Sequence, residues 1–287
     1  MRGSSADRFA RELHRCLEAV EAESDRLVAG AAPDPATVHQ LHRSLRQLRV
    51  GLAVWAETSR VRDRPELRRL GRRVRRLARR VGETRDLDIA LRQLGARRPA
   101  SRSGDVAALE ELRAELARRS RESRELLRLR FRAARSSGLF EQIEALRHDP
   151  ASRPTDVRLA RYWHDLQERE RAAVARAHRR ARRKPTMRRL HRLRIRVRNW
   201  RHLSDFAALT TVGEVPEPPE GLRTLQRNLG RLHDLGVVEE LAGPARSTRW
   251  VAELRAEQRR RRRRIVRSLK EIRPRELAAT PAPVPPA

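Results

Sequence analysis

The stretch VHQLHRSLRQLR, residues 38–49, sets two histidines and three arginines among leucines. Its apolar residues recur every three or four positions, which is the spacing of one buried face of an α-helix. At about 100° per residue, polar positions at offsets of 0, 3, 7 and 10 fall within an arc of about 80°. The stretch therefore predicts a helix that buries its leucines and carries, beside them, a basic stripe formed by His39, His42, Arg46 and Arg49.

A second stretch, LHRLRIRVRNWR at residues 190–201, repeats this pattern. Aligning His191 with His39 places Arg194, Arg198 and Arg201 at the same offsets. Each copy is also followed by a related segment, in which Gly82 and Asp86 match Gly230 and Asp234. Two matching pairs in the same order indicate an internal duplication. We therefore expect two basic stripes that face one central cleft.

The whole chain has the pattern of an all-α protein, because leucine, arginine, alanine and glutamate dominate and runs of β-branched residues are absent. Loops are predicted where glycine, proline and serine gather, and the proline-rich tail at 274–287 is expected to be disordered. Long helices are predicted at 5–29, 35–57, 64–81, 104–135, 155–183, 186–209 and 246–271. Shorter helices are predicted at 86–95, 137–147, 219–231 and 234–242.

Composition limits the setting and the partner. The 287 residues include one cysteine, so no internal disulfide can form, and no apolar run is long enough to cross a membrane. We expect a cytoplasmic protein. Sixty-eight Lys+Arg against 37 Asp+Glu give a formal net charge of +31, which predicts a polyanionic partner. The scarcity of aromatic residues argues against a binder of single-stranded nucleic acid, which stacks bases on aromatic rings.

Four interpretations of the histidine and arginine stripes compete. A metal site is disfavoured, since Zn²⁺ needs three or four ligands and the second copy has Arg194 where the first has His42. Acid–base catalysis by His39 and His191 is disfavoured, since no nucleophile, carboxylate pair or glycine-rich phosphate loop accompanies them. A third interpretation, that both stripes are solvent-exposed helix faces, is disfavoured because solvent-facing positions do not require the same histidine and arginine pattern in both copies. A phosphate-binding cleft accounts for both copies, and we expect no metal ion and no cofactor.

Two points stay open from the residues alone. Asp86 and Asp234 either orient arginines in the cleft or favour the start of a helix. The helix predicted at 64–81 carries arginine rows on both sides of its apolar seam, and either row could face inward. One row contains Arg68, Arg72, Arg75 and Arg79, and the other contains Arg69, Arg73, Arg76 and Arg80.

The motifs resemble those of the CHAD family, the conserved histidine α-helical domain. The family pattern is a helix of the form V-H-x-L-R followed by basic residues and L-R, then L-G-x-x-R-D-L-D, with the pair recurring in a second half. This chain supplies the first helix from Val38 to Arg49, and Gly82, Arg85, Asp86 and Asp88 from the second segment. The resemblance covers residues 1–273.

The resemblance implies two four-helix halves, at about 1–147 and 153–273, related by a pseudo-two-fold axis around a basic central cavity. It implies binding of inorganic polyphosphate without catalysis, and association with polyphosphate or polyhydroxyalkanoate granules. No E-x-E-x-K stretch of a triphosphate-tunnel enzyme occurs, so a stand-alone binding module is expected. The predicted polyphosphate contacts are His39, His42, Arg46, Arg49, Arg75, Arg79, Arg85, His191, Arg194, Arg198, Arg201 and Arg231.

Some positions depart from the family pattern, because His42, Gln47, Asn199 and His202 stand where other residues are usual. With protonated histidines among the contacts, affinity is expected to fall as pH rises from about 6 to 8 and as salt increases. Two other functions stay open. A helical architectural protein would bind nucleic acid, here non-specifically, and a phosphohydrolase accessory domain would take part in phosphate release.

Overall fold

The computed structural model describes residues 4–29, 34–59, 63–96, 103–149, 153–212, 215, 219–243 and 249–272. Within these ranges the chain is helical apart from short turns, which confirms the predicted all-α class. The tail predicted to be disordered, 274–287, lies outside the described residues. The helices are α1 (Ser5–Ala29), α2 (Pro35–Thr58), α3 (Arg64–Gly95), α4 (Ser103–Ser136), α5 (Leu139–His148), α6 (Asp156–Arg183), α7 (Met187–Thr210), α8 (Glu220–Leu241) and α9 (Arg249–Glu271).

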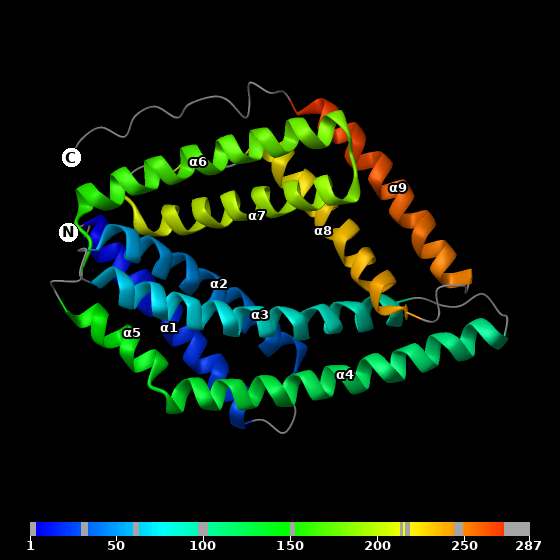
Figure 1. The fold of residues 1–287 in the computed structure, drawn as a ribbon, viewed down its shortest axis with the longest axis horizontal. Helices are drawn as coiled ribbons and strands as arrows, with labels where there is room; N and C mark the ends of the chain where they lie inside the picture. Colours follow the sequence, from blue (N-terminus) through cyan, green and yellow to red (C-terminus); the bar gives the residue numbers. More distant parts are fainter. Residues whose placement is uncertain are drawn as a thin grey trace.

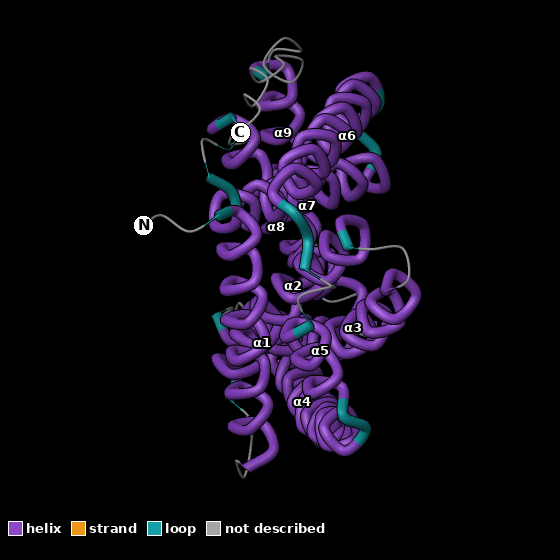
Figure 2. Tube along the Cα trace, turned by 90° about the vertical axis from the view of Figure 1, so that its left-hand side faces the viewer, coloured by secondary structure: helices purple, strands orange, loops and turns teal. Residues whose placement is uncertain are grey.

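The helices stack in layers, as Figures 1 and 2 show from two directions. The antiparallel pair α6 and α7 forms one layer, α2 and α3 form the middle, and α4 with α5 lies on the far side. Helices α8 and α9 run across one end and join the outer layers, and α8 packs on both α3 and α7. This arrangement places α2 and α7, the two helices of the repeated motif, in contact.

Two predicted helix breaks are absent. Residues 64–81 and 86–95 belong to one continuous helix, α3, and residues 219–231 and 234–242 belong to α8 apart from their ends. Gly82 and Gly230 lie inside these helices, where a glycine costs about 1 kcal/mol relative to alanine and does not force a stop. Gly82 lies against His42, since a Cβ at this position would make an ordinary contact of 3.8 Å with Cε1 of that ring.

Local chemistry accounts for the start and the position of α2. Asp34 caps the helix by accepting a hydrogen bond from the backbone N–H of Thr37 at 2.6 Å, and Pro35 occupies the first turn, as predicted. Further along, Gly51 lets α1 and α7 approach closely. A Cβ at this position would lie 2.7 Å from Cδ1 of Leu13 and 3.1 Å from Cζ of Phe206.

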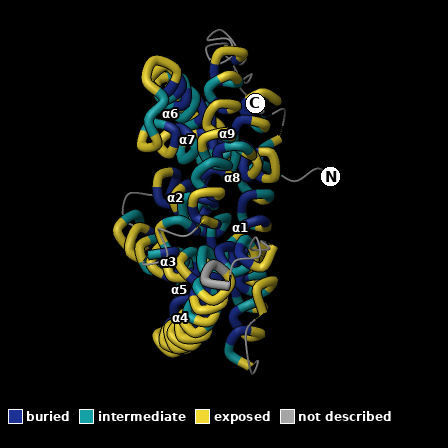
Figure 3. Tube along the Cα trace, turned by 90° about the vertical axis from the view of Figure 1, so that its right-hand side faces the viewer, coloured by how far each residue is buried: buried dark blue, intermediate teal, exposed yellow. Residues whose placement is uncertain are grey.

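The hydrophobic core has three clusters, and two of them contain helices from both expected halves. The largest joins α1 to α5 with Trp163 of α6 and Phe206 of α7. A second links the other ends of α6 and α7 to α8 and α9, and the third joins α3 and α4 to α8 and α9. Figure 3 shows exposed residues along the outer sides of α4 and α6 and buried residues toward the centre. The expected halves, 1–147 and 153–273, therefore pack against each other through a shared hydrophobic core.

Among the residues that the structure describes, no helix is both long and apolar enough to cross a membrane.

Candidate functional site

The two predicted stripes meet at the contact of α2, α3, α7 and α8. Each helix contributes side chains whose charges act on the others, and we call this group the central cluster. Its carboxylates are Asp86, Asp205 and Asp234, which lie among many more cationic side chains. Its basic members are His39, His42, Arg46, Arg49, Arg75, Arg85, His191, Arg194, Arg198, Arg201, His202 and His233.

Arginines from both copies of the motif lie close enough to repel one another. Burial, followed by the charges of Arg201 and Arg198, lowers the pKa of Arg46 to about 10. Burial and the charge of Arg198 lower the pKa of Arg194 to about 10 as well. Both groups remain protonated at neutral pH, so the free protein holds concentrated positive charge that an anion would stabilise.

Several of these arginines also have buried N–H donors that form no hydrogen bond within the described residues. In the described part of the chain, Nε of Arg46, Arg85 and Arg194 is buried without a hydrogen-bond partner, and so is Nδ1 of His42. Nε of Arg201 lacks a hydrogen bond too, although its charge lies 3.8 Å from Oδ2 of Asp205. A buried donor without a partner is costly, and a bound oxyanion is the natural acceptor for a guanidinium fork.

Asp86 and Asp234 take part in this network. Both lie well inside α3 and α8, so the alternative that they begin helices is wrong. Burial raises the pKa of each, whereas the charge of Arg85 acts on both in the opposite direction. Arg194 also lies near both carboxyls. They therefore lie within electrostatic range of the arginines of the central cluster.

The histidines of the cluster are neutral at neutral pH in the free protein. Burial, then the charges of Arg85 and Arg46, lowers the pKa of His42 to about 3. Burial lowers the pKa of His233 to about 4, with Arg194 as the next cause, and its ring centroid lies 5.5 Å from that of His191. The pKa of His191 is lowered too, first by burial. Protonated histidine contacts thus require the negative charge of a ligand.

Three arginines of one row of α3, Arg68, Arg72 and Arg75, line a pocket beside α2 while remaining exposed. Arg75 lies near Arg49, whose pKa is lowered by burial and then by the charge of Arg75. The other row faces α5, where Arg73 donates to Oε1 of Gln142 at 3.1 Å. The pocket, of about 620 Å³, lies between α2, α3, α6 and α7, and we call it the central pocket. Its basic lining consists of Arg46, Arg49, Arg68, Arg72, Arg75, Arg198 and His202.

Two predicted contacts lie elsewhere. Arg79 is exposed and pairs with Glu83 of its own helix at 3.1 Å. Arg231 is exposed on α8, and none of the described interactions of the cluster involves it. The residue of α8 that faces the arginines is His233. The duplication contains the signal for it, because aligning Gly82 with Gly230 sets His233 at the position of Arg85.

Among the described residues, no group of three or more histidine, cysteine, aspartate or glutamate side chains is arranged to hold a metal ion.

Fold and site together define an all-helical protein whose basic centre is assembled from two copies of one motif. The CHAD domain family model matches residues 11–243, and the chain belongs to this family. The crystal structure of the CHAD domain from the plant Ricinus communis superposes with a TM-score of 0.67 at 19% sequence identity. That match covers 98% of this chain and 94% of the plant chain, which shows a common fold over the whole length. No curated protein matches the chain significantly in sequence.

Proposed function

We propose that the protein binds inorganic polyphosphate in the central cluster without hydrolysing it. The observation that carries the proposal is the set of half-buried arginines from both motif copies whose Nε atoms lack partners. A linear phosphate chain offers closely spaced oxygens that accept charge-assisted hydrogen bonds from guanidinium forks. Family membership supports the same ligand, because the CHAD resemblance implies polyphosphate. Association with polyphosphate granules would follow from such binding.

The shape of the site favours a slender chain over nucleic acid. The arginines of the central cluster are half-buried between helices, which favours contact with a thin polymer over contact with a duplex. In the described lining of the central pocket, Tyr162 is the one residue among tyrosine, tryptophan and phenylalanine. The pocket therefore offers few aromatic rings on which bases could stack. The arginines remain protonated at neutral pH, so they suit charge stabilisation and not proton transfer.

A competition experiment tests the proposal. Labelled long-chain polyphosphate is bound to the protein and displaced by unlabelled polyphosphate, duplex DNA, RNA or short phosphates at several salt concentrations. We expect polyphosphate to displace the label at a lower phosphate concentration than either nucleic acid, and affinity to fall steeply with salt. Stronger displacement by DNA would favour the nucleic-acid function. Release of orthophosphate during incubation with a divalent metal would favour a phosphohydrolase.

The double variant Arg49→Glu/Arg201→Glu locates the binding site. Each residue comes from a different motif copy, and each lies beside further arginines, so reversal of both charges should abolish polyphosphate binding. Far-ultraviolet circular dichroism checks that the helices are retained. If the variant still binds polyphosphate as the unchanged protein does, the central cluster is not the site.

A further inference from the structure

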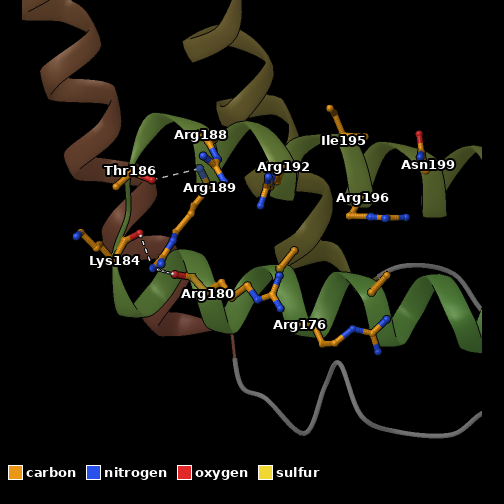
Figure 4. Close-up of a pocket in the computed structure, with 12 residues that line it drawn as sticks. Arg176, Arg180, Lys184, Thr186, Arg188, Arg189, Arg192, Ile195, Arg196 and Asn199 are labelled. Carbon is orange, nitrogen blue, oxygen red and sulfur yellow. Dashed lines mark hydrogen bonds between the residues drawn. The ribbon is translucent and has the colours of Figure 1, made fainter.

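A second basic groove lies outside the central cluster, between α6 and α7. Figure 4 shows its side chains on the facing sides of the two helices and the turn that joins them. The groove encloses about 850 Å³, and its apolar lining consists of Ala173, Ala177 and Ile195. We call it the α6–α7 groove. Its cationic lining consists of Arg176, Arg180, Lys184, Arg188, Arg189, Arg192 and Arg196.

The charge of this groove is almost uncompensated. None of its lining residues is acidic, and the nearest described ion pair joins Arg196 to Glu170 at 3.5 Å. Arg189 has a structural role, because its guanidinium donates to the backbone oxygen of Arg180 at 3.1 Å and thereby secures the turn. Among the described residues no hydrogen bond or ion pair engages the guanidinium groups of Arg176, Arg188 and Arg192, all of which are exposed.

Helix α7 presents this groove on a different face from the central cluster. At about 100° per residue, the stripe of Arg188, Arg192 and Arg196 lies about 130° around the helix from the stripe of His191, Arg194 and Arg198. The remaining face carries the buried residues Leu193, Val197 and Trp200. Helix α7 thus contributes one face to the core and two faces to separate basic surfaces. The repeated motif accounts for the surface of the central cluster and not for that of the groove.

The two basic surfaces meet at one point. Asn199 lines both the α6–α7 groove and the central pocket, and Arg198 stands beside it in the pocket. From Arg188 to Asn199 the groove extends eleven residues of helix, which is about 16 Å at 1.5 Å per residue. Its cations are spread along this length and do not converge on one point. Such a row suits an extended polyanion better than a single phosphate group.

We propose that the α6–α7 groove binds a second segment of a long polyphosphate chain, which passes from the central pocket over Asn199 and along α7 toward Arg188. The inference rests on the proposed polyphosphate binding and extends it to a second site. The unpaired guanidinium groups of Arg176 on α6 and of Arg188 and Arg192 on α7 would donate charge-assisted hydrogen bonds to phosphate oxygens. Chains too short to span both surfaces gain nothing from the groove, so it favours long polymers.

The test compares two triple variants with equal loss of charge. The groove variant carries Arg176→Gln, Arg188→Gln and Arg192→Gln. The control variant removes three exposed arginines of α4, on the opposite side of the molecule (Figure 1), and no described ion pair or hydrogen bond involves their side chains. Its substitutions are Arg121→Gln, Arg130→Gln and Arg132→Gln.

Binding is measured with polyphosphate of about 100 phosphates and with tripolyphosphate over a range of salt concentrations. For the long chain, we expect the groove variant to lose at least about tenfold in affinity at about 0.15 M salt. Its slope of log affinity against log salt should fall by about 2 to 3, because each phosphate contact contributes about one. Tripolyphosphate should bind the groove variant and the control within about twofold, and the control should keep most of its affinity for the long chain.

Each other outcome is decisive. If the groove and control variants bind the long chain equally, the groove is no part of the site, and the proposed function stands without it. Equal weakening of long and short probes in the groove variant would also overturn the inference, since the groove would then not extend the site. A loss confined to duplex DNA would assign the groove to nucleic acid. If the unchanged protein fails to bind polyphosphate, the proposed function and this inference fall together.

Discussion

Asp86 on α3 and Asp234 on α8 face each other closely enough that the charge of Asp234 raises the pKa of Asp86. Burial is the larger cause of that rise, and Arg85 opposes it at both carboxyls. Two residues that the internal duplication matches thus meet where α3 contacts α8. In the free protein they lie near arginines that a phosphate chain would contact, so we expect them to compete with the ligand.

Asp86→Asn should therefore tighten polyphosphate binding. Removing one competing carboxylate amounts to one more phosphate contact, which is worth about fivefold in affinity at about 0.15 M salt. The melting temperature should not fall, because a carboxyl whose pKa is raised by burial is already less stable in its charged form. Fluorescence titration with labelled polyphosphate and thermal unfolding measure the two effects. Weaker binding by Asp86→Asn would show that this carboxylate positions the arginines productively.

The matched control is Asp88→Asn, which makes the same change of charge two residues further along α3. Asp88 points away from the central cluster toward α4, where its Oδ1 accepts hydrogen bonds from Ser120 Oγ at 3.1 Å and from the Arg124 guanidinium. Affinity for polyphosphate should stay within about twofold, because the change alters only the general charge of the protein. A gain as large as that of Asp86→Asn would mean that the effect is not local.

The role of Asp88 itself is to hold α3 against α4. Asp88→Ala removes the acceptor and leaves the Ser120 hydroxyl and the largely buried Arg124 without it. We expect the free energy of unfolding to fall by about 2–4 kcal/mol, since an orphaned buried charge is costly. Urea unfolding measures this loss, and polyphosphate binding by the folded fraction should be retained. Asp88→Ala with unchanged stability would show that the ion pair contributes nothing.

Arg46→Met should separate binding from stability. Methionine keeps an unbranched apolar side chain while removing a charge whose pKa is lowered to about 10, chiefly by burial. Affinity for polyphosphate should fall at least about fivefold, and the free energy of unfolding should rise by about 1 kcal/mol as repulsion is relieved. Arg124→Met is the control, because that arginine is paired with Asp88 and its loss should destabilise the protein. A destabilised Arg46→Met would contradict the view that Arg46 is maintained for ligand binding.

The internal duplication allowed much of the site to be predicted, because its matched residues meet in space. Arginines at matched offsets from His39 and His191 come together in the structure, and the network around Arg46 and Arg194 joins the two copies. The prediction of Arg231 instead of His233 shows the limit of this reasoning. Arg231 was predicted because it is an arginine. The alignment of the two copies instead sets His233 at the position of Arg85, and His233 is the residue that faces the cluster.

Other features depend on packing that no local pattern encodes. The sequence left both arginine rows of α3 open, since each flanks the same apolar seam, and the contact of α2 with α3 places Arg75 beside Arg49. The expected breaks near Gly82 and Gly230 are absent because a single glycine inside a helix costs only about 1 kcal/mol, which the packing of the rest of the helix outweighs. The α6–α7 groove was not predicted, because the first copy of the motif has no arginine at the positions of Arg188, Arg192 and Arg196.

Gly51→Ala tests the close approach of α1, α2 and α7. The added Cβ would lie 2.7 Å from Leu13 Cδ1 and 3.1 Å from Phe206 Cζ, so both side chains must shift. We expect a loss of about 1–3 kcal/mol in the free energy of unfolding, measured with urea, as is typical of overpacking. Gly236→Ala is the control, since nothing lies within 4 Å of its Cβ and alanine favours the helix. Equal stability of the two variants would refute the steric argument.

Acidification should destabilise the free protein. The pKa of His42 is lowered to about 3, and those of His202 and His233 to about 4, in each case chiefly by burial. In the unfolded chain these groups titrate near 6.5, so the stability they contribute is present above that pH and is lost as pH falls toward 4. Asp86 and Asp234 have raised pKa values, so the folded protein takes up protons at these carboxyls more readily than the unfolded chain does. Their protonation stabilises the folded state as pH falls and offsets part of this loss.

Urea unfolding between pH 7 and pH 5 measures this dependence, and the variant His42→Gln/His202→Gln/His233→Gln isolates the histidines. Near pH 5 the unfolded chain of the unchanged protein takes up about three more protons at these positions than the folded one, which is a slope of about 4 kcal/mol per pH unit. The variant should lack that contribution. An unchanged slope would contradict the lowered pKa values, because no other substitution separates the two proteins.

The same histidines make polyphosphate binding dependent on pH. A bound phosphate chain supplies the negative charge that the free cluster lacks, so it should raise the histidine pKa values and draw protons from solution as it binds. Affinity should then increase as pH falls from about 7 to about 5.5, and calorimetry in buffers of different ionisation enthalpy should show proton uptake. The triple histidine variant should show both effects reduced to the contribution of His39 and His191. It should keep its salt dependence, since that dependence arises from the arginines.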